Sequence, residues 1–165
     1  MIAQEKYNIA DRLPENLSDE SRVWIYQAES ELTESEVSLI QKACKSFVPA
    51  WQAHGKNLQA DCRILFRRFL CLFVDESAQG ATGCSIDSSV HFVQDLEKQL
   101  GKSLMMRTQV IFLDDEGQLN EVDMHDMPSR VNSETPVFNN LVKTLEEMKT
   151  NWIIPAGQSW HSRML

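Results

Sequence analysis

The residue types best able to do chemistry gather in residues 75–91, which hold three acids, a small-residue loop, a cysteine and a histidine. Cys84 follows Gly83 at the point where a helical pattern begins. A thiol at a helix N-terminus feels the positive end of the helix dipole, which makes it a better nucleophile or ligand. The acids Asp75 and Glu76 would oppose this effect by charge repulsion. Cys84 is therefore a candidate nucleophile, and its alternative interpretation is a compact residue of the first turn.

His54 is the candidate general base, because the fold expected below brings residues 51–55 to the sheet edge where Cys84 lies. Its alternative role is a histidine stabilised by the negative end of a helix dipole. His91 is a poorer candidate, since about 10 Å of helix would separate it from Cys84. We interpret His91 as a surface partner of Asp87, four residues earlier.

Candidate binding residues surround the same loop. Asp75 and Glu76 end a strand and could bind a metal with His54 or act as an acid and base pair, but ordinary solvated acids also occupy strand ends. No established ligand spacing is present, so we expect neither a metal nor a cofactor. The candidate binding set is Trp51, Asp75, Glu76, Gly83, Asp87 and His91.

Known nucleotide and hydrolase motifs are missing from the sequence. The GATG segment at 80–83 could cradle an anion before a helix, yet a P-loop requires Lys where Cys84 stands. The patterns GxGxxG and GxSxG do not occur. The sequence therefore contains none of these motifs that would support an enzyme.

Length and composition favour an ordinary globular domain. The chain has 165 residues, is 42% hydrophobic and carries a net charge of -8. Such an acidic chain is a poor nucleic-acid binder, since phosphate contacts depend on Lys and Arg. No segment has the length and apolar character to cross a membrane, and the first residues lack the regions of a secretory signal. We therefore expect a cytoplasmic protein that binds neither nucleic acid nor membrane.

The four cysteines show no CxxC pair and no zinc-like spacing. In a reducing cytoplasm they are expected to be free thiols. Two of them fall on apolar patterns and are predicted to be small core residues, and a third opens a strand. The four positions are Cys44, Cys62, Cys71 and Cys84.

The first half of the chain predicts alternating strands and helices after a polar arm at residues 1–20. Strand patterns cover 22–27, 61–66 and 69–74, and the last of these is apolar on both faces. Thr33 and Glu36 form a capping box that opens a helix running to about Trp51. No Gly or Asn separates the second and third strands, so a hairpin and a single long strand are both open.

The second half continues the pattern. Apolar residues from Ile86 to Leu100 have helical spacing, and Gly101 closes that helix. Strands are predicted at 108–113 and 119–123, joined by a turn. The remaining segments are an irregular stretch at 124–135, a helix at Val137–Lys149, and a tail with two tryptophans that should pack on the domain or on a second subunit.

The element order predicts an α+β fold of the ferredoxin-like type. Strand, helix, strand, strand, helix, strand is the order of the split βαβ arrangement, with two helices covering the sheet. A hairpin strand and a C-terminal helix follow. We expect one α+β domain over residues 21–165. In this topology the first helix ends and the second begins at the same edge of the sheet.

Four segments of the chain resemble a family of small uncharacterised bacterial proteins, found chiefly among the Bacteroidetes, whose members are often labelled ABC-transporter ATPases. The resemblance covers the chain from about Leu13 onward, and it implies no established catalytic residue. The ATPase label has no Walker motif behind it in this sequence. The segments are RVWIYQ at 22–27, WQAHG at 51–55, VDES at 74–77 and GCSIDSSVHF at 83–92.

Two functions remain open from the sequence. The first is a non-enzymatic binding or interaction protein, with a homodimer or a protein partner held by the tail or by an open sheet edge. The second is a thiol-dependent enzyme with Cys84 as nucleophile, His54 as base and backbone donors near Gly83. The first is favoured because no motif requires catalysis.

Overall fold

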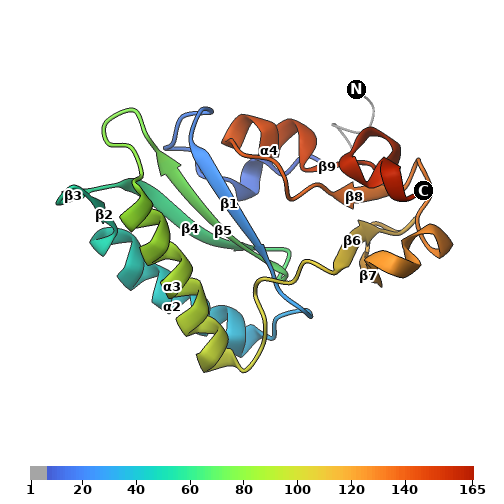
Figure 1. Ribbon diagram of the computed structural model, residues 1–165, viewed down its shortest axis with the longest axis horizontal. Helices are drawn as coiled ribbons and strands as arrows, with labels where there is room; N and C mark the ends of the chain where they lie inside the picture. Colours follow the sequence, from blue (N-terminus) through green and yellow to red (C-terminus); the bar gives the residue numbers. More distant parts are fainter. Residues whose placement is uncertain (1–6) are drawn as a thin grey trace. The chain divides into compact units, whose positions relative to one another are not determined.

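The chain folds into two compact units, shown in Figure 1 as a computed structural model that describes residues 7–165. We call residues 14–106 the central unit. Residues 107–165, together with the described residues of the N-terminal segment that ends at Leu13, form the terminal unit. Each unit contains an antiparallel sheet, so the α+β class is confirmed. The single domain over residues 21–165 stays a prediction, and residues 1–6 of the predicted arm lie outside the described residues.

The central unit is a three-stranded sheet in the order β1-β5-β4 with two helices. Both pairings are antiparallel, so β1 and β4 run parallel with β5 between them, and α2 connects them. Its elements are β1 (Arg22–Gln27), α2 (Glu34–Ala50), β2 (Gln52–Ala53), β3 (Lys56–Asn57), β4 (Gln59–Leu65), β5 (Phe69–Asp75) and α3 (Gly83–Leu100).

The expected ferredoxin-like sheet is not confirmed, because its fourth strand is missing from this order. The strand predicted at 108–113 forms as β6 (Gln109–Leu113), but it belongs to the sheet of the terminal unit. Two backbone hydrogen bonds hold the segment after α3 beside the end of β1: Met106 N to Gln27 O at 3.0 Å and Glu29 N to Ser103 O at 2.9 Å. The chain thus passes β1 without forming a strand against it.

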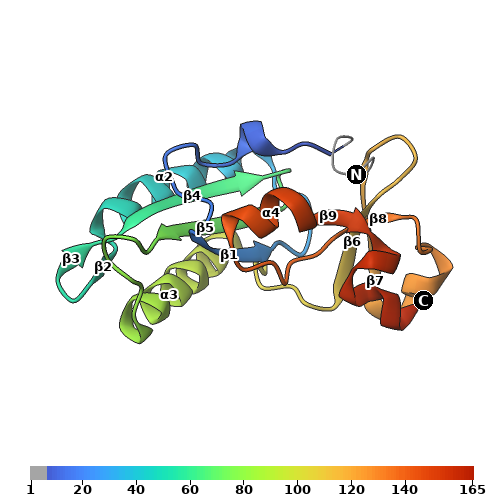
Figure 2. The ribbon, with the colours of Figure 1, turned by 90° about the horizontal axis from the view of Figure 1, so that it is seen from above.

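Local sequence explains the two helices of the central unit. Thr33 caps α2, and the side chain of Glu36 accepts a bond from the Thr33 N–H, which completes the predicted capping box. Thr82 caps α3 in the same way, and α3 ends at Gly101 with a φ of 64°. Both helices lie on one face of the sheet in Figures 1 and 2. Their apolar sides share a core with the sheet that includes Ile40, Leu70, Val93 and Leu96.

The hairpin between β4 and β5 forms even though no Gly or Asn marks its turn. Phe66 and Arg67 both have positive φ, at 56° and 51°, and Arg68 N donates to Leu65 O at 3.1 Å. This is the backbone of a type I′ turn, which usually requires Asn or Gly. The alternative of a single long strand is therefore wrong. All seven residues of β5 are buried; the apolar pattern predicted this for residues 69–74, and Asp75 adds a buried carboxylate.

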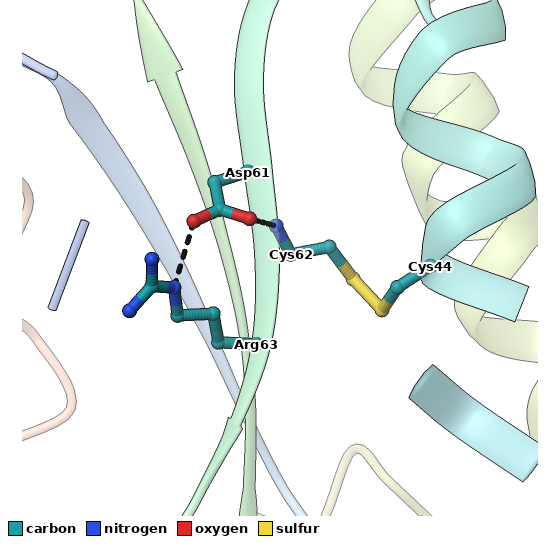
Figure 3. The surroundings of a disulfide bond; sticks show 4 residues. All are labelled: Cys44, Asp61, Cys62 and Arg63. Carbon is teal, nitrogen blue, oxygen red and sulfur yellow. Dashed lines mark hydrogen bonds and ion pairs between the residues drawn. A yellow bond between two sulfur atoms is a disulfide. The ribbon is translucent and has the colours of Figure 1, made fainter. Parts of the chain in front are cut away.

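The prediction of four free cysteines is wrong for two of them. Cys44 of α2 and Cys62 of β4 form a disulfide, with Cα atoms 5.6 Å apart (Figure 3). The two residues are only 18 positions apart in sequence, but the sheet order brings them together, which spacing alone does not reveal. Cys71 and Cys84 remain free thiols, the first buried and the second exposed.

The terminal unit has a four-stranded sheet in the order β7-β6-β8-β9. The helix predicted at 137–149 is wrong in its first half, because residues 136–138 form a strand. Thr144 caps the helix that does form, by accepting a bond from Glu147 N at 3.1 Å. Apart from β6, its elements are η1 (Ala10–Arg12), β7 (Leu119–Asp123), η2 (Met124–Ser129), β8 (Pro136–Phe138), α4 (Leu145–Asn151), β9 (Ile153–Pro155), η3 (Ala156–Gln158) and η4 (Trp160–Met164).

The tail packs on its own unit. Trp152 is fully buried, contacts the Phe138 ring at a centroid distance of 5.1 Å and donates from Nε1 to Asn140 Oδ1 at 2.9 Å. The next residues form β9, which pairs with β8. The apolar character of the tail therefore reflects internal packing in the terminal unit.

Candidate functional site

The loop after β5 is organised by Asp75, the last residue of that strand. Its Oδ1 accepts bonds from Ser77 Oγ at 2.6 Å and Ser77 N at 3.0 Å, and its Oδ2 accepts one from Ser18 N at 3.2 Å. The bonds from Ser77, then the one from Ser18, hold the pKa of Asp75 below its usual value. Asp75 is an ionised carboxylate that joins the arm before β1 to this loop.

Glu76 closes the other side of the loop. Its Oε2 accepts a bond from Ala81 N at 2.9 Å, and its Oε1 lies 3.4 Å from Arg22 Nε. A Cβ atom added at Gly80 would lie 3.1 Å from Glu76 Oε2, so a glycine there allows the carboxylate to reach the backbone. Both acids of the predicted pair therefore bind groups of the central unit itself.

The start of α3 contains Gly83 and Cys84 and lies beside the end of α2. Trp51 Nε1 donates to Ser85 O at 2.8 Å, so the topology argument placed these two segments correctly. Ser85 and Ser89 are buried on the inner side of α3, which the apolar pattern missed. Ser89 Oγ bonds to Ile86 O at 2.6 Å, so its hydroxyl is satisfied within the helix. Small side chains at these positions let α3 lie close to Trp51.

His54 occupies the turn between β2 and β3, and its side chain is exposed. Its φ is 52°, and Gly55 follows at 74°, so the two residues form the centre of a tight turn. Among residues 7–165, no hydrogen bond joins the His54 ring to the exposed thiol of Cys84. The structure brings Trp51 to the start of α3 but does not couple the predicted base to the predicted nucleophile.

Asp87 and His91 lie on the exposed side of α3, together with Cys84. The inner side carries Val93 and Leu96, as the spacing predicted. No ion pair joins Asp87 to His91 in the part of the chain that the structure describes. The pairing expected between them is thus not present.

The described residues hold no group of three or more His, Cys, Asp or Glu side chains arranged to bind a metal. The other free thiol, Cys71, is fully buried in β5, and burial raises its pKa far above the usual range. Cys71 is therefore an inert core residue. Of the predicted site residues, Cys84 is the one exposed free thiol in residues 7–165.

A buried serine and histidine pair lies in the terminal unit and was not predicted as a site. His161 Nδ1 is 2.7 Å from Ser159 Oγ, and only 2% of His161 is exposed. Burial lowers the pKa of His161 to about 4, so the ring is neutral at pH 7. Ser159 Oγ also accepts a bond from His161 N at 3.1 Å and donates to Ala156 O at 3.1 Å, a local turn geometry that stabilises the start of η4.

No family model, curated protein or solved structure matches this chain. In the described part of the chain, every helix is too short or too polar to cross a membrane.

Proposed function

We propose that this protein is a non-enzymatic binding or interaction protein. One observation carries the proposal: within residues 7–165, each predicted catalytic or binding side chain is bonded to its own surroundings or lies apart, and none is bonded to another of the set. Asp75 and Glu76 bind backbone and side-chain groups of their own loop, and His54 occupies a turn. Catalysis by a nucleophile and base requires the two groups within hydrogen-bond reach and a third group to orient the base.

The second candidate is a thiol-dependent enzyme with Cys84 as nucleophile. The observation that favours it is the exposure of this thiol in the first turn of an 18-residue helix, where the backbone N–H groups point outward. His54 would then have to approach Cys84 when a substrate binds. This candidate predicts that the thiol reacts unusually fast and that His54 contributes to its reactivity.

Alkylation of Cys84 separates the two candidates. The rate of its reaction with iodoacetamide is measured from pH 6 to pH 10 by peptide mass spectrometry. The measurement compares the natural protein with the His54→Asn variant. Asparagine is chosen because it tolerates the positive φ at this position. For an interaction protein, Cys84 reacts like an unstructured cysteine peptide and the variant changes nothing. A rate at least about tenfold above that of the peptide at neutral pH, lost in His54→Asn, would show a thiol activated by His54 and would favour the thiol-dependent enzyme.

We also propose that the chain belongs to the family of small bacterial proteins that it resembles, and that it works in the cytoplasm. The Cys44–Cys62 disulfide tests the location, because disulfides persist mainly in oxidising compartments. Acid quenching of intact cells, followed by alkylation and mass spectrometry, should find both cysteines as thiols if the protein works in the cytoplasm. A disulfide that survives this trapping would place the protein in an oxidising compartment.

A further inference from the structure

The strand β4 is an edge strand with a regular backbone along its whole length. It has seven consecutive pairs with β5 and no bulge, and it contains neither Lys nor Pro. Natural proteins commonly protect exposed edges with such residues or with a bulge. Within the central unit, no backbone hydrogen bond other than those of the β5 ladder reaches residues 59–64. The outer side of β4 therefore presents a regular strand.

The opposite edge of this sheet differs. The segment that follows α3 bonds to the end of β1, through Met106 N to Gln27 O and Glu29 N to Ser103 O. A partner strand would have to displace this segment to pair along the whole of β1. Of the two edges, β4 is the one that can accept a full-length strand.

The direction of the backbone groups on β4 follows from the turn. Arg68 N donates to Leu65 O, so the Leu65 backbone faces β5. Backbone direction alternates along an antiparallel strand, so the N–H and C=O groups of Ala60, Cys62 and Ile64 point outward. Cys62 N bonds to Asp61 Oδ1 at 2.8 Å, so in the single chain a side chain occupies this outward donor.

The charges of β4 are arranged symmetrically about Cys62. Asp61 precedes it and Arg63 follows it, and both side chains lie on the side of the strand away from the disulfide (Figure 3). Arg63 Nε contacts Asp61 Oδ2 at 2.7 Å, and the side chains are 38% and 32% exposed. An antiparallel copy centred on Cys62 would place each Asp61 directly opposite an Arg63, because residues equally far from the centre face each other.

We propose that a second copy of this chain pairs antiparallel with β4 about a two-fold axis at Cys62, so that Asp61 and Arg63 of the two chains form reciprocal ion pairs. This inference rests on the proposed interaction function and names its partner. The pairing joins two three-stranded sheets into one of six strands. Cys62 N exchanges its bond with Asp61 for one with the carbonyl of the partner's Cys62, and Asp61 is released to the partner's Arg63.

Two details fit a non-covalent contact of this kind. The Arg63 guanidinium carries five donors in a fixed geometry, so it can bond to more than one acceptor at the same time. The side chain of Cys62 points toward Cys44 of α2, away from the side of the strand that carries Asp61 and Arg63 (Figure 3), so it takes no part in the ion pairs. The interface is thus specified by backbone pairing and by charge.

The test uses charge reversal on one strand. Asp61→Arg places Arg opposite Arg in the homodimer, and Arg63→Asp places Asp opposite Asp. Like charges facing each other are destabilising, so each variant should dimerise about tenfold to a hundredfold more weakly than the natural chain in sedimentation equilibrium. Asp95→Arg, an exposed reversal on α3, is the matched control and should leave dimerisation unchanged.

Mixing the two variants separates an interface from a structural role within the chain. The Asp61→Arg chain has arginine at both positions 61 and 63, and the Arg63→Asp chain has aspartate at both. In a mixture each arginine faces an aspartate, so the heterodimer should be as stable as the natural dimer. Loss of the ion pair inside each chain cannot be repaired by mixing. A natural chain that stays monomeric, or a mixture that does not associate, overturns the second-copy inference; the proposed interaction function is tested separately by the alkylation of Cys84.

Hydrogen exchange keeps the inference testable if a variant fails to fold. In the natural protein, the amides of Ala60, Cys62 and Ile64 should exchange more slowly as protein concentration rises, while those of β1 do not change. Equal exchange at all concentrations would overturn the inference, and protection confined to β1 would do the same.

Discussion

The two tight turns of the central unit reach similar backbone conformations by different means. The turn between β2 and β3 has His54 and Gly55 at its centre, with φ values of 52° and 74°. The turn between β4 and β5 has Phe66 and Arg67, with φ values of 56° and 51°. Glycine adopts positive φ at little cost, whereas other residues pay about 1–2 kcal/mol each. The second turn must therefore be stabilised by its surroundings.

Those surroundings are the loop between β1 and α2, to which two arginines bind. Arg67 Nε donates to Leu32 O at 2.9 Å, and Leu32 N donates back to Arg67 O at 2.7 Å. Arg68 Nε donates to Ala28 O at 2.8 Å and its Nη2 donates to Glu29 O at 3.1 Å. One turn thus places a glycine at one of its two positive-φ positions, whereas the other has no glycine and is held by hydrogen bonds to a distant segment.

The largest expected effect comes from Arg68→Met, which removes the donors but keeps much of the side-chain length. Arg68 is 6% exposed and Ala28 is fully buried, so the carbonyl of Ala28 would lose its side-chain donor in the interior. We expect the free energy of unfolding to fall by about 2–3 kcal/mol. Exchange of the buried amides of β5 measures this change in the central unit.

Arg107→Met is the control for Arg68→Met, because it makes the same change of charge at an exposed position. We expect it to alter stability by no more than about 0.5 kcal/mol. If Arg68→Met costs no more than this control, the β4–β5 turn does not depend on its contacts with the β1–α2 loop.

This difference also explains which parts of the fold the sequence predicts. The strands and helices with strong patterns formed where expected, including β5 and α3. The turn at Phe66 carries no local signal, because its cause lies about 40 residues away in the loop at Ala28. The placement of β6 depends likewise on pairing with β7, β8 and the path of residues 101–106. Such non-local pairing is not written in a periodic pattern.

The sequence predicted where the candidate site lies, but it did not predict which hydrogen bonds the site residues make. Crossover topology correctly placed Trp51 beside the start of α3. The same reasoning did not show that the Asp75 and Glu76 carboxylates would be occupied by Ser77 and Ala81. Residue type identifies groups able to do chemistry, but only three-dimensional distances show whether their hydrogen-bonding capacity is already used.

Gly55→Ala sharpens the comparison at the other turn, with a smaller effect. A Cβ atom at Gly55 would meet nothing within 4 Å, so the cost is that of positive φ alone. We expect the β2–β3 hairpin to lose about 1 kcal/mol, seen as about fivefold faster exchange of the amides of residues 56–58. Gly83→Ala also adds a Cβ in open space, but without positive φ, and should not accelerate this exchange. Equal behaviour of both variants would mean that Gly55 does not determine the turn.

Glu31→Gln is expected to have the smallest effect, although Glu31 also contacts the β4–β5 turn. Its Oε1 lies 3.8 Å from Arg67 Nε, and the side chains of Arg67 and Glu31 are 47% and 71% exposed. An exposed ion pair at this distance contributes no more than about 0.5 kcal/mol, and salt screens it. The bond from Arg67 Nε to Leu32 O remains in the variant and keeps the turn in place. Urea unfolding at low and high salt tests this: a loss above about 1 kcal/mol that disappears in high salt would show that the turn is stabilised by charge rather than by its bonds to backbone carbonyls.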